Sequence, residues 1–159
     1  MDEAAKKQAL RMIPYGLFVL TARNGDDIAS ATVNWVTQSS FKPPLVAVGI
    51  KADTHPYQVV KAAGSFAINV LGADQKDIAQ AFFMTVQPEG NKLGPVTFHP
   101  GETGSPILNE TPAYWECRVV DVLEQGDHHI FVGEVVEAGV NENPSPTLLM
   151  RDTGWNYGG

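Results

Sequence analysis

Three residues whose side chains can bind an anion, Lys51, Thr54 and His55, stand together before a predicted helix. The helix is expected to begin at Thr54, because Thr54 can cap it, Pro56 suits its first turn and Gly64 can end it. The unpaired amides and the dipole of a helix N-terminus attract anions, and Lys51 adds a positive charge. We therefore expect a phosphate group to bind here, although Thr54 can equally be only a cap and Lys51 only a solvated charge.

Two adjacent histidines, His128 and His129, follow a predicted turn at residues 125–127. Neighbouring residues on a strand point to opposite faces, so the two imidazoles cannot share one ion, and no metal site is expected. Beside the turn, His128 is as consistent with a solvated loop residue as with a ligand-binding side chain. Cys117, the single cysteine, lies within an alternating strand and is expected to fill the core rather than act as a nucleophile.

Motifs that would indicate other chemistries are absent from the sequence. A parallel dinucleotide-binding fold needs a glycine-rich turn between a strand and a helix, and neither G-x-G-x-x-G nor a P-loop occurs. If a dinucleotide binds, it is therefore expected to bind transiently. The helix motif of zinc proteases and the G-x-S-x-G turn of serine hydrolases are also missing.

Length and composition predict one soluble domain. The chain has 159 residues, of which 43% are hydrophobic, so we expect a single domain over residues 1–159. Its net charge of −7 argues against nucleic acid and anionic membranes as partners, because both require a concentrated basic face. One cysteine excludes disulfides within the chain and fits a reducing cytoplasm. Residues 1–12 lack the apolar core of a signal peptide, and no segment is apolar enough to span a bilayer.

Most of the predicted elements are strands. An Asn-Gly turn joins the apolar segments 16–22 and 28–33 into one hairpin, and a glycine turn joins strands 113–123 and 128–138 into a second. Further elements are expected as strands at 45–50 and 65–71 and as helices at 2–12, 54–63 and 74–83.

Two segments are predicted to be irregular. Residues 84–106 are rich in glycine, proline and polar side chains and are expected to form a long loop, either a lid or part of an interface. The tail from residue 141 is also expected to lack regular structure. In total the sequence predicts a mainly β protein, with about six strands and two or three short helices, arranged as one closed or split barrel.

The segment Ala31–Val46, with the sequence ATVNWVTQSSFKPPLV, resembles the flavin reductase-like family of FMN-binding split barrels. In that family a Thr/Asn-rich strand end, a serine and a Pro-Pro-Leu-Val strand start wrap the flavin. Later landmarks follow in the same order, at residues 51–55, 66–71, 104–108 and 126–135. The resemblance covers about residues 14–139 and implies a Greek-key-like, FMN-binding split β-barrel of mainly β structure with minor α.

The resemblance also implies which residues contact the flavin. Residues 32–34 at the strand end would run along the ring, and Ser39 and Ser40 would reach the ring edge or the ribityl chain. The residues at the helix start, 51–55, would bind the phosphate. Trp155 either closes over the flavin or packs against a partner subunit. The expected flavin-binding residues are Thr32, Val33, Asn34, Ser39, Ser40, Lys51, Thr54, His55 and Trp155.

The activity implied by the family is hydride transfer from NADH or NADPH, bound transiently, to FMN. His128 would orient the nicotinamide over the flavin without acting as an acid or a base, because the cofactor carries the chemistry. The alternative is an FMN-containing electron-transfer protein, similar to flavoredoxin, that is reduced by a protein partner. A split barrel that binds haem or a pyridoxal-type phosphate is a third interpretation.

The resemblance further implies a homodimer, because a small barrel leaves a large apolar face open. The reduced flavin would serve free flavin, a partner oxygenase or another electron-accepting protein. No motif indicates which nicotinamide cofactor or which acceptor is used.

Overall fold

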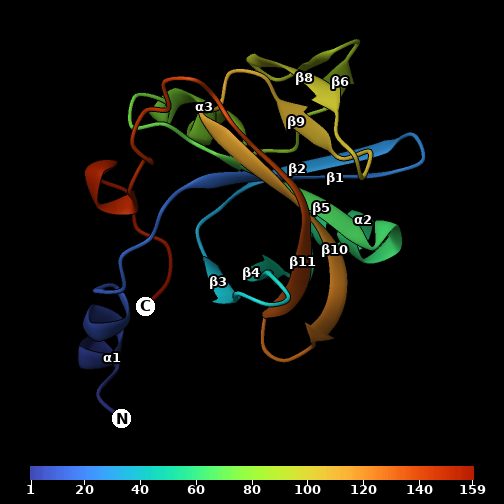
Figure 1. Ribbon diagram of the computed structural model, residues 1–159. Helices are drawn as coiled ribbons and strands as arrows, with labels where there is room; N and C mark the ends of the chain where they lie inside the picture. The colour runs from blue at the N-terminus through green and yellow to red at the C-terminus, as the bar shows by residue number, and fades with distance from the viewer.

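Two hairpins form most of a seven-stranded antiparallel sheet in the computed structural model, which describes residues 1–159. The sheet has the order β2-β1-β5-β10-β11-β4-β3, and four short strands form a second sheet in the order β6-β7-β8-β9 (Figure 1). In chain order the elements are α1 (Glu3–Leu10), β1 (Phe18–Asn24), β2 (Asp27–Val33), β3 (Val36–Ser40), β4 (Leu45–Lys51), α2 (His55–Ala63), β5 (Ser65–Val70), α3 (Lys76–Ala81), β6 (Pro88–Glu89), β7 (Lys92–Leu93), β8 (Val96–Pro100), β9 (Pro106–Leu108), β10 (Ala113–Leu123), β11 (His128–Val140) and the 3-10 helix η1 (Met150–Asp152). None of the helices combines the length and the hydrophobicity that a membrane-spanning helix requires.

The larger sheet curls so that its two edge strands are consecutive in the chain. β2 ends at Val33 and β3 begins at Val36, yet each pairs with only one neighbour and they do not pair with each other. Only Asn34 and Trp35 join them, and the Trp35 carbonyl accepts a hydrogen bond from the amide of Gly49 on β4 at 2.9 Å. The two edge strands of the barrel are thus connected by this two-residue link and not by backbone hydrogen bonds between them. We call this opening between β2 and β3 the split.

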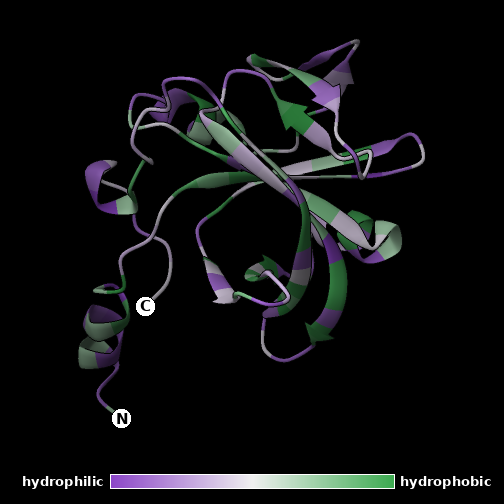
Figure 2. Ribbon diagram, viewed as in Figure 1, coloured by the Kyte–Doolittle hydropathy of each residue, from purple (hydrophilic) through white to green (hydrophobic).

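Both faces of the curled sheet are buried against apolar side chains. Alternating residues of β1 show this, because Leu20 belongs to the core inside the barrel and Val19 to a second core outside it. The inner core is completed by strand residues and the apolar face of α2, and the outer core by α3 and the smaller sheet. Strand β9, strongly hydrophobic in Figure 2, is buried along its whole length in that outer layer.

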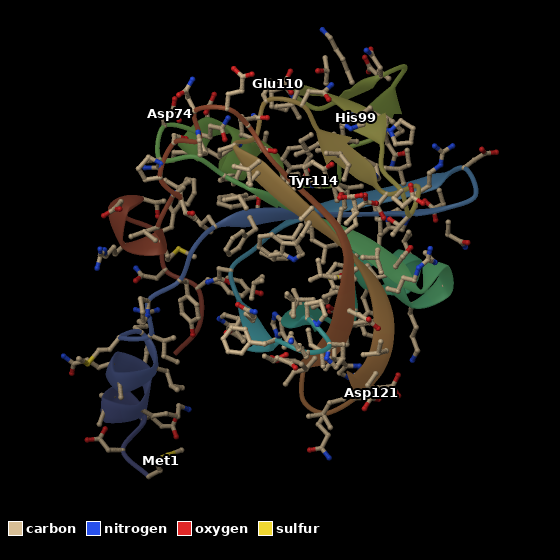
Figure 3. All side chains as sticks on the ribbon, viewed as in Figure 1. Met1, Asp74, His99, Glu110, Tyr114 and Asp121 are labelled. Atoms are coloured by element: carbon tan, nitrogen blue, oxygen red, sulfur yellow. The ribbon has the colours of Figure 1, made fainter.

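The prediction of a long loop at residues 84–106 is wrong in part. Strands β6, β7 and β8 lie within this segment, and the polar stretch after residue 36 contains β3. Short strands in a polar sequence lack an apolar period, and here tertiary contacts stabilise them. The Glu110 carboxylate accepts hydrogen bonds from the amide and hydroxyl of Thr97, and His99 bonds to Asn109 at 2.6 Å. Figure 3 shows Glu110 and His99 beside the smaller sheet.

A buried carboxylate anchors the loop that leads into β9. Glu116 on β10 is 0% exposed, and its two oxygens accept hydrogen bonds from the amides of Glu102 and Thr103 and from the Thr103 hydroxyl. A Cβ atom at Gly101 would lie 2.4 Å from this carboxylate, so the close approach requires glycine there. The neighbouring Cys117 is buried, as predicted, and burial raises its thiol pKa to about 12.

We predict that Glu116→Ala destabilises the fold by about 3 kcal/mol, because two backbone amides and a hydroxyl lose the buried carboxylate that accepts their hydrogen bonds. Chemical denaturation followed by tryptophan fluorescence measures the change. The control is Glu137→Ala, which removes the exposed carboxylate paired across the strand and is expected to cost less than about 0.5 kcal/mol. Equal losses in the two variants would contradict the anchoring role.

Candidate functional site

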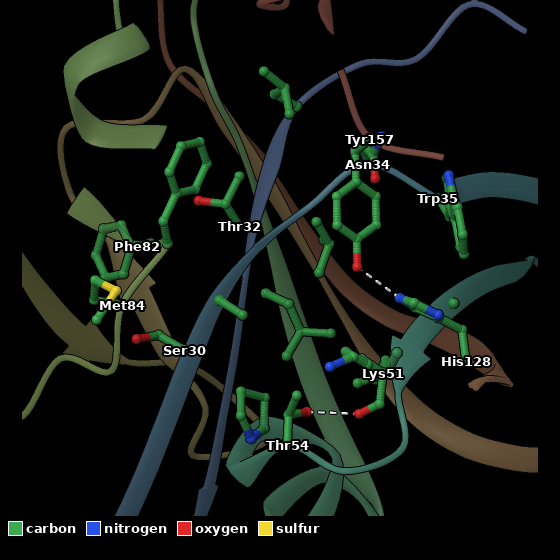
Figure 4. A pocket seen from close by; sticks show the side chains of 18 of the residues that line it. Ser30, Thr32, Asn34, Trp35, Lys51, Thr54, Phe82, Met84, His128 and Tyr157 are labelled. Atoms are coloured by element: carbon green, nitrogen blue, oxygen red, sulfur yellow. Dashed lines mark hydrogen bonds between the residues drawn. The ribbon is translucent and has the colours of Figure 1, made fainter. Parts of the chain in front are cut away.

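A cavity of about 750 Å³ opens beside the split, within the range of roughly 300–1,000 Å³ found for small-molecule and cofactor sites. Its wall comes from β2 and the link to β3, the end of β4, the start of α2, the segment after α3, the start of β11 and the chain after η1 (Figure 4). The lining residues are Leu17, Leu20, Ser30, Ala31, Thr32, Val33, Asn34, Trp35, Gly49, Ile50, Lys51, Asp53, Thr54, His55, Pro56, Phe82, Phe83, Met84, Thr85, His128, Met150, Trp155, Asn156 and Tyr157.

The free edge of β2 supplies polar groups to this wall. The Thr32 amide donates outward to the Phe82 carbonyl at 3.1 Å, and its hydroxyl donates to the Ala79 carbonyl at 2.6 Å. Backbone groups alternate along a strand, so the amides of Ser30 and Asn34 face the same unpaired edge. The edge therefore offers a ligand both donors and acceptors.

Three buried polar atoms of the wall have no hydrogen-bond partner in the protein. They are Ser30 Oγ, Asn34 Nδ2 and Trp35 Nε1. Buried polar groups are normally paired, so these three atoms leave hydrogen-bonding capacity unused in the residues of the wall. The Trp35 side chain packs closely against Gly49 of β4, where an added Cβ would be 3.2 Å from the ring.

The N-terminus of α2 forms one end of the cavity. Thr54 caps the helix by accepting from the Tyr57 amide at 3.4 Å, and its hydroxyl donates to the Lys51 carbonyl at 2.7 Å (Figure 4). Lys51 lies 3.1 Å from Asp53, and His55 lies 2.9 Å from Asp27. Both side chains thus have carboxylate partners that an incoming anion must replace.

His128 forms another part of the wall and is held on both ring nitrogens. Nδ1 is 2.8 Å from Asp127 Oδ1, and Nε2 is 2.8 Å from the Tyr157 hydroxyl (Figure 4). The hydrogen bond with His128 lowers the pKa of Asp127. The imidazole is also 4.5 Å from the Trp35 ring and is 13% exposed. Its orientation in the cavity is therefore fixed by three neighbours.

His129 points to the other face of β11, as its place in the strand predicts. Its Nδ1 lies 2.8 Å from the Tyr57 hydroxyl, away from the cavity. The two histidines therefore bond to different partners on opposite faces. No group of three or more His, Cys, Asp or Glu side chains is arranged to hold a metal ion.

The segment after η1, predicted as irregular and as the source of Trp155, completes the wall with aromatic side chains. Trp155 packs edge-on against Phe83 with ring centroids 4.8 Å apart, and Lys76 Nζ lies 4.9 Å from its ring. The Gly158 carbonyl accepts a hydrogen bond from Arg11 Nε at 3.1 Å. Contacts with α1, α3 and β11 therefore hold this segment against the barrel.

Most of the residues predicted from the sequence meet in this one cavity, although they come from four separate parts of the chain. Thr32, Val33, Asn34, Lys51, Thr54, His55, His128 and Trp155 all line it. Ser39 and Ser40 do not, because the chain after Trp35 turns along β3 and pairs with β4, as in the Ser40–Leu45 pair. Their predicted contact with the ligand is not supported by the cavity of this chain.

The sequence analysis missed other residues of the wall. Ser30 is two residues before Thr32 on β2, and residues two apart on a strand face the same side. This alternation could have indicated that Ser30 also faces the cavity. Phe82 and Met84 follow a short helix and carry no local signal of a cavity. They reach it only because α3 packs on the free edge of β2.

The family model described as "Flavin reductase like domain" matches residues 10–158. A Rhodococcus opacus protein described as the reductase component of 4-nitrophenol 4-monooxygenase/4-nitrocatechol 2-monooxygenase is 36% identical over 87% of this chain and 72% of its own length. A "probable flavin reductase" of Rhizobium meliloti is 35% identical over 84% of this chain. The matched region is only 42% of the length of that relative. The solved NADH:FAD oxidoreductase of Streptomyces globisporus, in complex with NAD and FAD fragments, has a TM-score of 0.78 at 29% identity, covering 91% of this chain and 86% of that one. These relatives confirm the split-barrel fold.

We predict that Tyr157 ionises above its ordinary value of 10.0, because burial raises the pKa of its phenol. The neutral phenol then contributes stability below the ordinary pKa, and this contribution is lost as the pH rises through the higher folded value. The protein has four tyrosines, so the ultraviolet absorbance titration of Tyr157→Phe is subtracted from that of the wild type. The difference reports the ionisation of Tyr157 alone. A difference curve with its midpoint at or below 10.0 would contradict the expectation.

Proposed function

The chain belongs to the flavin reductase-like family, and we propose that it reduces FMN bound in the cavity with NADH or NADPH. One observation carries the proposal: a helix N-terminus, unpartnered polar atoms and an aromatic wall meet in a single cavity beside the split. These are the groups that a phosphorylated, flat and polar-edged ring system requires. We further propose that residues 1–159 form one flavin-binding domain.

The start of α2 would bind the FMN phosphate. Pro56 has no N–H, and the Tyr57 amide already donates to Thr54. The His55 amide, the Thr54 hydroxyl and the Lys51 ammonium are therefore the groups that would contact the phosphate at this helix N-terminus. His55 would leave Asp27, and Lys51 would leave Asp53, to pair with the more highly charged anion. One helix N-terminus with Lys51, Thr54 and His55 forms a binding site for one phosphate group, and FMN carries a single phosphate.

The free edge of β2 would hold the isoalloxazine ring. The Ser30 and Asn34 side chains, which have atoms without a partner in the protein, would supply hydrogen bonds for its polar edge. Phe82 and Trp155 supply apolar surface and exclude water from the ring. A bound flavin accepts a hydride from the reduced nicotinamide and passes the electrons on to an acceptor.

His128 would place the nicotinamide against the flavin. Its ring is held by Asp127 and Tyr157, so an incoming nicotinamide meets a fixed imidazole instead of a mobile one. Hydride transfer needs no proton from the protein, and His128 acts by position alone.

A homodimer is proposed because apolar surface remains open around the cavity. Phe83 is 52% exposed and Met84 is 75% exposed at its rim, and α1 buries none of its residues. An isolated helix of eight residues is marginal in water, so α1 requires a further contact. The Rhodococcus opacus relative is described as a reductase component, which supports an oxygenase partner as the acceptor of reduced flavin.

The purified protein tests the proposed function directly. FMN is expected to bind, to lose fluorescence on binding and to support rapid oxidation of NADH or NADPH in the presence of excess flavin. A bound flavin that stays oxidised under both nucleotides, but is reduced by a reduced protein partner, would identify an electron carrier instead.

We predict that the double variant Lys51→Ala, Thr54→Ala raises the dissociation constant of FMN about 100-fold, the loss expected for two contacts to a charged phosphate. Fluorescence quenching titrations measure it. Thr54→Ser keeps the hydroxyl and the cap, and Lys42→Ala removes a lysine outside the cavity, so both controls should retain affinity. Unchanged FMN affinity in the double variant would rule out the phosphate assignment.

We predict that His128→Ala slows flavin reduction by NADH about 10-fold to 100-fold, as a misplaced reactant does, while FMN affinity stays unchanged. Stopped-flow absorbance of the bound flavin measures the rate. His129→Ala is the matched control, because its imidazole faces Tyr57 on the other side of β11. An unaltered reduction rate in His128→Ala would remove this residue from the mechanism.

A further inference from the structure

Two carboxylates already hold the nitrogen-bearing side chains at the start of α2. Asp53 contacts Lys51 with both carboxylate oxygens, which lie 3.1 Å and 3.3 Å from the Lys51 Nζ. Asp27 contacts His55, with 2.9 Å between its Oδ1 and the imidazole Nε2. Lys51 and His55 are two of the groups proposed to bind the flavin phosphate, so each must exchange a carboxylate for it.

The two carboxylates come from different parts of the chain. Asp53 lies in the short link between β4 and Thr54, the cap residue of α2. Asp27 is the first residue of β2, 28 positions before His55, and it reaches the helix because α2 packs against β1 and β2. Neither side-chain contact belongs to a strand ladder or to the helix itself. Both carboxylates can therefore be neutralised without removing a backbone hydrogen bond of the fold.

The side chains at this end of the cavity supply no excess of positive charge. Lys51 is the only lysine or arginine among the lining residues, and Asp53 is the only aspartate or glutamate, so their charges cancel. Asp27 adds a further negative charge beside His55. A phosphate monoester carries more than one negative charge at neutral pH, and it therefore meets two carboxylates near the groups that bind it. These carboxylates repel the phosphate even after Lys51 and His55 have left them.

Both carboxylates are weak competitors because they are exposed. The side chains of Asp53 and Asp27 are 73% and 56% exposed, and exposed ion pairs contribute little free energy. A phosphate that also receives the His55 amide and the Thr54 hydroxyl can displace them. The expected effect is thus a reduced affinity and not a blocked site.

We propose that Asp27 and Asp53 compete with the flavin phosphate for His55 and Lys51, an inference that rests on the proposed function. Competition lowers the affinity for FMN but not for riboflavin, which lacks the phosphate. The two aspartates thus set how strongly the cavity prefers a phosphorylated flavin, and they hasten the release of FMN. A purely structural role predicts the opposite, because a carboxylate before a helix N-terminus stabilises the helix and Asp27 fastens α2 to the hairpin.

The experiment compares FMN with riboflavin in variants that lose a charge and keep the side-chain shape. Asp27→Asn and Asp53→Asn retain an oxygen that can accept a hydrogen bond. Each substitution is expected to lower the dissociation constant of FMN about threefold, and the double variant about tenfold, as exposed ion pairs allow. The dissociation constant of riboflavin is expected to stay at the wild-type value. Fluorescence quenching titrations measure both constants, and the recovery of fluorescence after dilution measures the slower release of FMN.

Further variants separate competition for a particular partner from a general loss of charge. Asp26→Asn removes the preceding carboxylate of the same hairpin, which contacts Arg23 at 4.0 Å, and it should change the affinity for neither flavin. In a Lys51→Ala background, Asp53→Asn is expected to give a smaller gain in FMN affinity, because the ammonium for which it competes is gone. The gain of the double variant should also shrink at high salt, since screening weakens interactions between exposed charges.

Three results would overturn the proposal. They are an FMN-to-riboflavin affinity ratio that is unchanged in the double variant, weaker FMN binding together with a lower urea midpoint of unfolding, and an equal gain from Asp53→Asn with and without Lys51. If the wild type binds neither flavin, the proposed function fails and this inference fails with it. If the wild type binds both flavins and the double variant leaves their ratio unchanged, the inference alone fails.

Discussion

The structure depends on a sheet that closes on itself without pairing its last two strands. β2 and β3 are joined by Asn34 and Trp35 only, so the outer edge of β2 keeps backbone groups that no strand satisfies. An unpaired edge is normally a liability in a β protein. Here α3 covers part of it through the Thr32–Phe82 hydrogen bond, and the remainder faces the cavity. The split in the barrel and the proposed flavin site are therefore the same feature.

The groups around the split combine positive charge with aromatic surface. Lys51, beside the N-terminus of α2, is paired across β4 and β11 with His128, whose ring lies close to those of Trp35 and Tyr157. In a chain with a net charge of −7, an anionic ligand finds favourable potential only where cations are placed locally. The part of the cavity beside Lys51 and the start of α2 is such a place.

Local signals in the sequence were sufficient for the regular elements. The Asn-Gly turn, the glycine turn at residue 126 and the continuous apolar run at 45–50 each correspond to a strand boundary or a strand in the structure. The cap at Thr54 and the left-handed Gly64 bound α2 as predicted. Strands β3 and β6 to β8 were missed, because pairing partners and side-chain bonds such as Thr97–Glu110 stabilise them, and these come from elsewhere in the chain.

By itself the sequence determined the mainly β class, the turn and cap positions, and which residue types could hold a phosphorylated ring, since all of these depend on neighbours along the chain. Only the tertiary structure decided which of those residues face one cavity. It brought Thr32, Lys51, His128 and Trp155 together and left Ser39 and Ser40 outside, because the curl of the sheet sets the direction of each edge strand. It also added Ser30, Phe82 and Met84 to the wall. Such sites depend on contacts between segments that are distant in the sequence, and these contacts cannot be predicted from local sequence patterns.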